Sequence, residues 1–427
     1  MMYITAKVKP LPLHNHYREG EASALHNFLH YPYMQKLISK LTLLAAIACV
    51  FALTGCGKHC LEDQCSADDE QDINPNAVVG PLLQTKWGQG SPYNDMFPYM
   101  PEHEKASDRN GRLVTDCGTT AATQIIAYHR HPNRATGLST VLNPHGIDVP
   151  QVNFEDYTFD WANMRNTYTS ADPGTELQRK AVAELMFIYG MARGISSLAT
   201  ARMVNYFGYD KSIQRLYRIY YNDAEWEAII RQQLDLELPV HYYGTGSISH
   251  AFVIDGYDNA GRFHINWGWS GRDDGWYSLN ALNPGNHDFN NDNSIIINIK
   301  PDAGGVGSNL MGLIEISPSK TSVSQNEKFN VTARIRSMGV FTGGQIGAVL
   351  VNNNGDESVI CSASLGEIWG GSTWTRTISN CSVPNTVSPG FYKLQIVTRI
   401  TGEEEWKIIT LSDISNGTPN SIDFEVQ

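Results

Sequence analysis

Residues 115–132 read TDCGTTAATQIIAYHRHP, and this stretch decides how the rest of the chain is interpreted. Thr115 or Asp116 can cap the start of a helix, small and aliphatic residues give it an apolar face, and Pro132 marks its end. Cys117 is therefore expected in the first turn, where unpaired backbone N–H groups favour a thiolate and can hold an oxyanion. A free cysteine there is either a nucleophile or a small buried hydrophobic residue, and the helix position alone leaves both readings open.

Predicted strands follow further along the chain. PVHYY at 239–243 is one strand, and HAFVIDG at 250–256 follows a glycine-containing loop. RFHINWGWSG at 262–271 supplies a neighbouring strand that ends at Asn266. A nucleophile on a helix, with a base (His250) and an orienting amide on strands, is the arrangement of a Cys-His-Asn site. The separation of the first two, 250 − 117 = 133 residues, lies within the papain-like range.

Together these blocks resemble the streptopain-like cysteine peptidases, family C10 of the papain-like clan. That family's motifs read roughly GCVATAxAQIxxYHxYP, HAFVIDGY and HxNWGWGG, and PLLQTKW at 81–87 resembles the start of its mature domain. The resemblance runs from about Val79 to Lys300. It implies an α+β papain-like peptidase domain and an endopeptidase that cleaves proteins or peptides through an acyl-enzyme. It implies no cofactor and no metal.

The same resemblance assigns roles to individual residues. Cys117 would be the nucleophile and His250 its base, Asn266 would orient the imidazole, and Trp267 would shield that contact from water. Trp267 could equally be an ordinary core tryptophan. His264 is a competing base, because it lies two residues before Asn266 and so shares its strand face.

Two departures from the family pattern keep other functions open. Asp116 and Gly118 replace the usual glycine and valine beside the nucleophile, and a neighbouring carboxylate disfavours a thiolate. No glutamine stands shortly before Cys117, where papain-like enzymes place an oxyanion donor; Asn110 is a candidate. The alternatives are a catalytically impaired relative that acts as a binding or adhesion protein, and an amidase or transferase with the same Cys-His chemistry.

The N-terminal part of the chain predicts export. Residues 34–56 read MQKLISKLTLLAAIACVFALTGC, with Lys36 and Lys40 before an apolar run at 41–53 that is short for a membrane span. The final LTGC resembles a bacterial lipobox, so Cys56 is expected to be lipidated and to begin the mature chain. A plain signal peptide or a short membrane anchor is the alternative.

These features divide the N-terminus into two predicted segments. Residues 1–55 comprise an over-extended N-terminus, with the true start expected at Met34, and a lipoprotein signal peptide. Residues 56–77 form an acidic tether. The protein is therefore expected to be an exported lipoprotein of the outer membrane or cell surface, with a periplasm-facing position as an alternative. The membrane would be a partner through the lipid anchor.

Residues 78–303 are the predicted peptidase domain, and the glycine-rich residues 304–308 are predicted to form a linker. Residues 309–427 are predicted to form an all-β sandwich, immunoglobulin-like, because short alternating strands recur between turn residues. Its role as a binding or adhesion module, or as a spacer, is left open.

Charge and cysteines limit the remaining possibilities. The formal net charge of −12 argues against nucleic acid as a partner. No C-x-x-C pair occurs, while Cys361 with Cys381, and Cys60 with Cys65, could form disulfides in an oxidising compartment. The tether is too short for a folded inhibitory pro-domain, so we expect the protein to be active without proteolytic removal of a pro-segment. A separate inhibitor protein is one way in which its activity could be restrained.

Overall fold

The computed structural model describes residues 76–100, 110–140, 149–194, 196–413, 417 and 419–427. The predicted signal peptide, the lipidated Cys56 and almost all of the acidic tether lie outside the described residues. The described residues all belong to one compact unit. No helix in the described part of the chain is long and apolar enough to cross a membrane.

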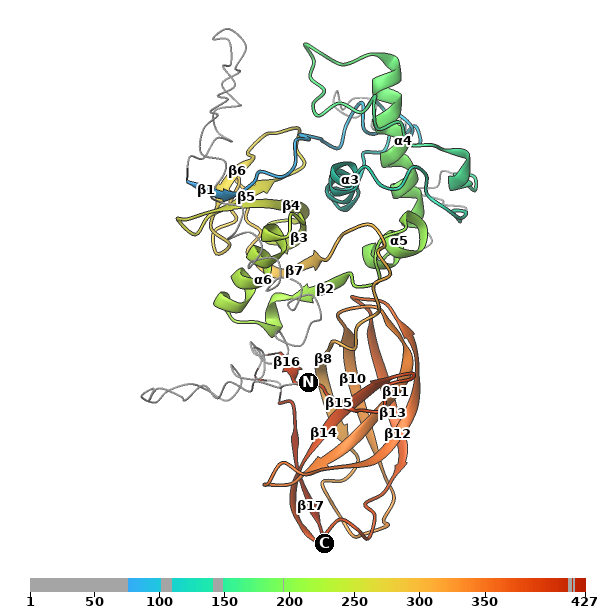
Figure 1. Ribbon diagram of the computed structural model, residues 1–427, viewed down its shortest axis with the longest axis vertical. Coiled ribbons are helices and arrows are strands. Elements are labelled where there is room, and N and C mark those ends of the chain that lie inside the picture. Colours follow the sequence, from blue (N-terminus) through green and yellow to red (C-terminus); the bar gives the residue numbers. More distant parts are fainter. Residues whose placement is uncertain (1–75, 101–109, 141–148, 195, 414–416, 418) are drawn as a thin grey trace, which may run out of the picture. The chain divides into compact units, whose positions relative to one another are not determined.

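The peptidase region pairs helices with one antiparallel sheet (Figure 1). Its strand order is β2-β7-β3-β4-β5-β6, and β1 pairs with β4. The strands are β1 (Ala77–Val79), β2 (Gln214–Tyr217), β3 (Val240–Thr245), β4 (Ser249–Asp258), β5 (Phe263–Asn266), β6 (Gly275–Tyr277) and β7 (Asn291–Ile297). The helices are α3 (Cys117–His129), α4 (Glu176–Ala192), α5 (Ala199–Phe207) and α6 (Asp223–Asp235), with short 3-10 turns η3 (Phe154–Asp156) and η4 (Arg218–Tyr220).

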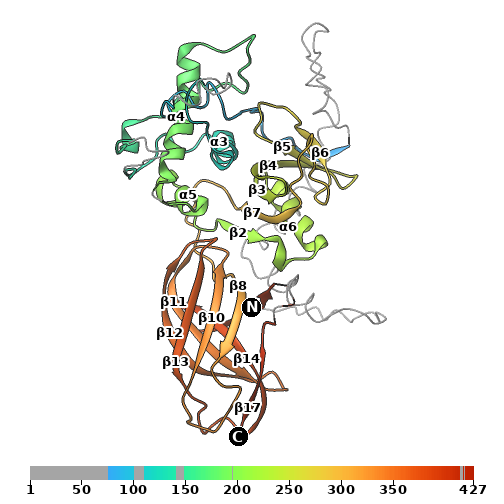
Figure 2. The same ribbon diagram turned by 180° about the vertical axis from the view of Figure 1, so that it is seen from behind.

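Helix α3 forms where the sequence predicts it. The Asp116 side chain caps its start by accepting a hydrogen bond from the Thr119 N–H at 3.0 Å. Arg130 ends it in the left-handed conformation, two residues before Pro132. The helix lies between β4 and α4 and is seen end-on in Figures 1 and 2. Its buried residues run from Thr119 to Ile126, so α3 is a central helix that holds Cys117 rigidly against the sheet.

The C-terminal region is a sandwich of two sheets that share one apolar core. One sheet has the order β13-β10-β8-β16, and the other β12-β11-β14-β17-β9 with β15 on β14. The strands are β8 (Met311–Pro318), β9 (Ser322–Val323), β10 (Phe329–Ser337), β11 (Phe341–Val351), β12 (Glu357–Ile368), β13 (Thr373–Cys381), β14 (Gly390–Ile400), β15 (Lys407–Ile408), β16 (Leu411–Ser412) and β17 (Ile422–Val426). A disulfide between Cys361 and Cys381 links the edge strands of the two sheets. The immunoglobulin-like assignment stays a prediction.

The loop between β10 and β11 continues the edge of the peptidase sheet. Gln214 on β2 forms a β-bridge with Gly339, and the Arg215 N–H donates to the Met338 carbonyl at 2.6 Å. Met338 and Val340 are fully buried in apolar clusters of the peptidase region. The loop thereby protects an edge strand that would otherwise expose unpaired backbone groups.

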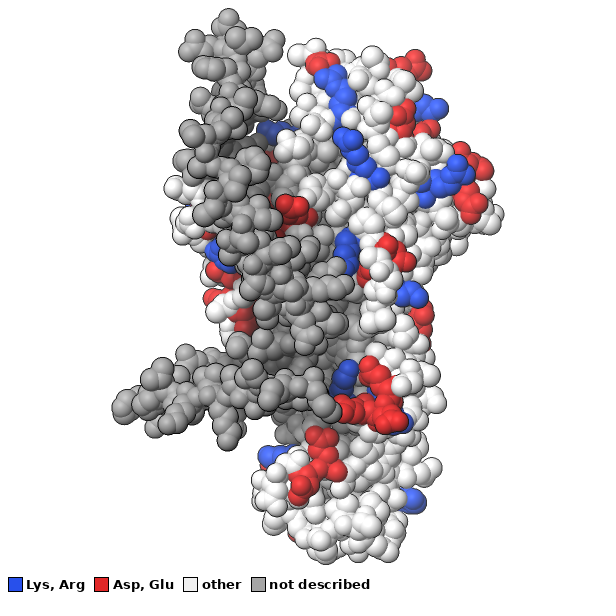
Figure 3. Space-filling model, viewed as in Figure 1, with Lys and Arg blue, Asp and Glu red and all other residues white. Residues whose placement is uncertain are grey.

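Charged side chains are spread over the surface. On the face seen in Figure 3, the described basic and acidic residues alternate in small groups and do not gather into one basic area.

Candidate active site

Cys117 is the free cysteine of the described residues, and it is half-buried at the first position of α3. The backbone N–H groups of Ala251, Gly118 and Cys117 itself favour its thiolate and so lower the pKa of the thiol. Burial raises the pKa of the thiol, and the negative charge of Asp116 adds to this. The three N–H groups act in the opposite direction but do not cancel it, so the resting group is a thiol.

Asp116 gives a second reason for this resting state. Burial raises the pKa of its carboxyl, but the Arg193 guanidinium at 3.1 Å and two hydrogen bonds from Thr119 outweigh burial and lower it overall. Asp116 is therefore ionised at neutral pH. The carboxylate that the sequence places beside the nucleophile disfavours the thiolate in the direction predicted, and Arg193 offsets part of its charge.

His250 on β4 immediately precedes Ala251, whose amide favours the Cys117 thiolate. Its Nε2 lies 2.8 Å from the Trp267 carbonyl oxygen. Because a carbonyl only accepts, Nε2 carries the proton and Nδ1 keeps its lone pair, which is the tautomer a general base needs. Burial lowers the pKa of His250 to about 4, so the imidazole is neutral before reaction.

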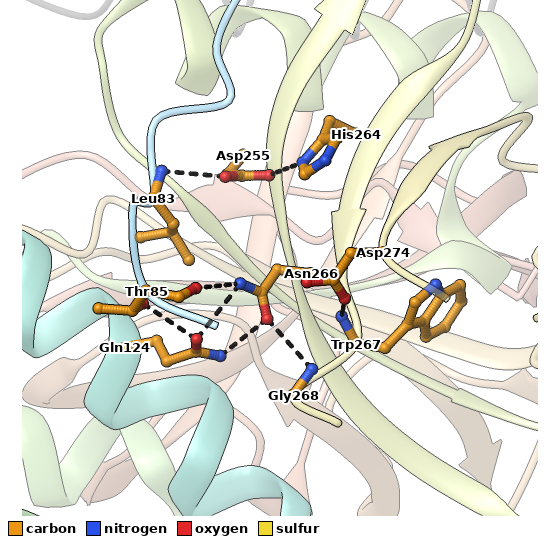
Figure 4. A network of polar contacts seen from close by, with 9 residues as sticks. All are labelled: Leu83, Thr85, Gln124, Asp255, His264, Asn266, Trp267, Gly268 and Asp274. Atoms are coloured by element: carbon orange, nitrogen blue, oxygen red, sulfur yellow. Dashed lines mark hydrogen bonds and ion pairs between the residues drawn. The ribbon is translucent and has the colours of Figure 1, made fainter. Parts of the chain in front are cut away.

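The structure corrects the predicted role of Asn266. Its Nδ2 donates to the Thr85 carbonyl at 2.7 Å, and its Oδ1 accepts from Gln124 Nε2 at 2.9 Å and from the Gly268 N–H at 3.1 Å (Figure 4). The hydrogen bond predicted from Asn266 to His250 is replaced by the one from His250 to the carbonyl of the next residue. Asn266 still influences the base, since the Trp267 carbonyl and the Gly268 N–H belong to one rigid peptide plane.

The shielding predicted for Trp267 is shared among several rings. Trp267 is fully buried, with its ring centroid 6.4 Å from that of His250. Trp269 and Phe289 approach the imidazole more closely, at 4.8 and 5.3 Å. The Trp267 N–H donates to Asp274 Oδ1 at 2.8 Å, which fixes the backbone whose carbonyl holds His250 (Figure 4). The backbone of Trp267 thus orients His250, while its ring packs in the core.

His264, the competing base, is engaged elsewhere. Its Nδ1 lies 2.6 Å from Asp255 Oδ1, and both side chains are buried. The other carboxylate oxygen of Asp255 accepts the Leu83 N–H at 2.9 Å (Figure 4). This pair therefore ties β4 and β5 to the N-terminal segment of the domain.

The sequence did not indicate that Gln89 lies next to the segment that precedes Cys117. Its Nε2 donates to the Thr115 carbonyl at 2.7 Å, and the Thr115 N–H donates to the Gln89 carbonyl at 3.1 Å. These bonds place a side-chain amide beside the segment that leads into Cys117. Gln89 is 117 − 89 = 28 residues earlier in the chain, too far to have been weighed as an oxyanion donor. Asn110, the candidate from sequence, lies in an exposed turn.

Comparison with known proteins identifies the family. Residues 87–277 match the model of the Peptidase C10 family. The active wild-type interpain A cysteine protease of Prevotella intermedia is similar, with 34% identity over 53% of this chain and 97% of that chain, at a TM-score of 0.45. This chain belongs to the peptidase C10 family. The predicted family is thereby confirmed.

Other relatives in the comparison are partial matches. Streptopain of Streptococcus pyogenes is 33% identical over 256 residues, which are 52% of this chain and 63% of that protein. The chain thus spans less than two thirds of the streptopain sequence. The thiol protease/hemagglutinin PrtT of Porphyromonas gingivalis is 27% identical over 380 residues, 81% of this chain and 42% of that protein. Within the described residues, no cluster of three metal-binding side chains occurs.

Proposed function

We propose that this C10 family member is a cysteine endopeptidase with Cys117 as nucleophile and His250 as base. The observation that carries the proposal is the hydrogen bond from His250 Nε2–H to the Trp267 carbonyl, which leaves Nδ1 unprotonated. His250 directly precedes Ala251, whose amide favours the thiolate of Cys117 at the α3 N-terminus. The family and the thiol protease relatives support the same reaction.

Proton transfer accompanies attack, because both reacting groups are neutral beforehand. Nδ1 of His250 takes the thiol proton as the Cys117 sulfur bonds to the scissile carbonyl carbon. The Trp267 carbonyl stabilises the imidazolium that forms. The Cys117 N–H and the Gln89 amide are the proposed donors to the oxyanion. The imidazolium then protonates the leaving amine, and water activated by His250 hydrolyses the thioester to release the acid.

The setting of the enzyme is part of the proposal. The LTGC stretch ending at Cys56 supports a lipid-anchored exported protein that acts on proteins or peptides at a membrane surface. Intact-mass analysis of the membrane-extracted protein should show acyl chains on an N-terminal Cys56. An unmodified product that begins elsewhere would reject the anchor and leave the peptidase proposal untouched.

Three alanine variants test the catalytic assignment. Cys117→Ala and His250→Ala should abolish hydrolysis of an unfolded protein substrate while Tm stays near the wild-type value. His264→Ala is the matched histidine control and should keep most turnover per folded molecule. Residual activity of Cys117→Ala within tenfold of wild type would reject the nucleophile. The opposite result for the two histidines would make His264 the base.

A further inference from the structure

A row of residues crosses the sheet from the nucleophile toward its β2 edge. Helix α3, which begins with Cys117, packs against β4, where the Ala251 amide favours the Cys117 thiolate. Ala251 stands opposite Tyr243 on β3, Tyr243 opposite Ser294 on β7, and Ser294 opposite Tyr217 on β2. Because paired residues share a face of the sheet, these side chains form one continuous strip that begins at the thiol.

Arg215 extends over this strip. Its Nη2 donates to Ser294 Oγ at 3.2 Å, and its guanidinium carbon lies 5.4 Å from the Tyr217 ring centroid and 6.0 Å from that of Tyr243. The side chain is half-buried, and its Nε is buried with no hydrogen-bond partner among the described atoms. Two aromatic faces and a hydroxyl thus hold the cation in place.

No carboxylate of the described residues lies within ion-pair distance of Arg215. This is unexpected in a chain with a formal charge of −12. A partly buried guanidinium still has donors to offer and interacts strongly with an anion in a low-dielectric site. The available donors and the position on the strip indicate a binding role.

The strip lies where the acyl half of a substrate would run. His250 packs against Trp267 and Trp269, on the β5 side of β4, and the leaving amine must meet the imidazole there. The acyl half therefore extends the other way, over β3. Adjacent strands are about 4.8 Å apart, so Ser294, two strands from Ala251, is about 10 Å away, and an extended peptide advances about 3.3 Å per residue. The second or third residue before the cleaved bond can thus reach Arg215.

We propose that Arg215 is a specificity-determining residue that binds a substrate carboxylate, so that the enzyme prefers Glu or Asp at the second or third position on the acyl side of the cleaved bond. The inference rests on the proposed peptidase function. The planar guanidinium can bind a carboxylate through two parallel N–H donors, and the ring of Tyr243 can pack against the methylene groups of the acidic residue.

Paired peptides provide the first test. Each pair differs only by Glu or Gln at the second or the third position, and kcat/KM is measured with the full chain. We expect about a tenfold preference for Glu at one of the two positions. Arg215→Gln should reduce that preference to within twofold, Arg215→Lys should retain part of it, and Arg334→Gln, an exposed arginine on β10, should leave it unchanged. No preference in wild type, or a preference that survives Arg215→Gln, would overturn the proposal.

A binding assay separates this inference from the peptidase function. The same peptides are used to protect Cys117 from iodoacetamide, read out by mass spectrometry, and this requires no turnover. The Glu peptide should protect wild type at about tenfold lower concentration than the Gln peptide, and the difference should disappear in Arg215→Gln. Selective protection without hydrolysis would reject the peptidase function and retain the carboxylate site. Hydrolysis without selectivity in either assay would reject the carboxylate site alone.

Discussion

Replacing Asn266 with alanine separates its structural role from a direct catalytic one. The change removes the partner of three buried groups: the Thr85 carbonyl, Gln124 Nε2 and the Gly268 N–H. Gln124 Oε1 keeps its hydrogen bonds from Thr85 Oγ1 and the Trp87 N–H. Each orphaned group costs about 1 kcal/mol, the low end for buried groups, because water can enter the vacated space. The free energy of unfolding should fall by about 3 kcal/mol.

For a unit of this size that loss corresponds to a Tm about 6 °C lower, at about 2 °C per kcal/mol. The kcat should fall only about tenfold, because the Asn266 side chain acts on His250 through the 267–268 peptide. Asn266→Asp keeps the oxygen that accepts the Gly268 N–H and should lose stability with a smaller change in kcat. Calorimetry and steady-state kinetics on the same preparations provide both values.

A direct contact between Asn266 and the imidazole would produce the opposite pattern. Loss of an orienting group that touches the base costs about 10⁴ in kcat with little change in stability. An Asn266→Ala protein with wild-type Tm and a kcat reduced by that factor would refute the indirect role. His250→Ala serves as the control, since it should abolish activity whatever its effect on Tm.

Three further outcomes are expected. His264→Ala should lower the free energy of unfolding by about 3 kcal/mol, because it leaves Asp255 buried without that partner. The kcat should change less than threefold. A variant with full stability and lost activity would contradict this. Asp116→Asn removes a charge that raises the pKa of the Cys117 thiol, so the thiolate fraction and the iodoacetamide rate at pH 7.5 should rise several-fold; a slower rate would show the reverse coupling. Gln89→Ala should lower kcat about 100-fold at unchanged Tm, and unaltered kcat would remove it from the oxyanion site.

The helix that carries Cys117 could be predicted because its signals are local. A capping carboxylate, an apolar face and a proline two residues beyond the C-cap stand within one short stretch, and α3 begins and ends accordingly. The strand that follows His250 was equally visible in its apolar run. Cys117 and His250, the two proposed reacting groups, could thus be placed from the residues that flank them.

The parts that escaped prediction depend on backbone groups or distant pairing. The hydrogen-bond acceptor for His250 is a backbone carbonyl. Every residue has a backbone carbonyl, so the sequence does not indicate which one His250 will use. The Asp255 pairing of His264 appears only when β4 and β5 are placed in register. Arg215 meets Ser294, 79 residues away, because β2 pairs with β7 across most of the domain. Such contacts require the register of the whole sheet, which composition and motif spacing do not supply.

The loop that carries Met338 and Val340 also bears on how this protein can evolve. A recombination event that joined the peptidase to a different C-terminal module at glycines 304–308 would remove two side chains from the peptidase interior and the bridge at Gly339. The recombined protein would have a cavity in the peptidase core and an unpaired edge at β2, and an unpaired strand edge favours aggregation. In this protein, exchange of the C-terminal module is therefore disfavoured, because the module supplies part of the peptidase interior.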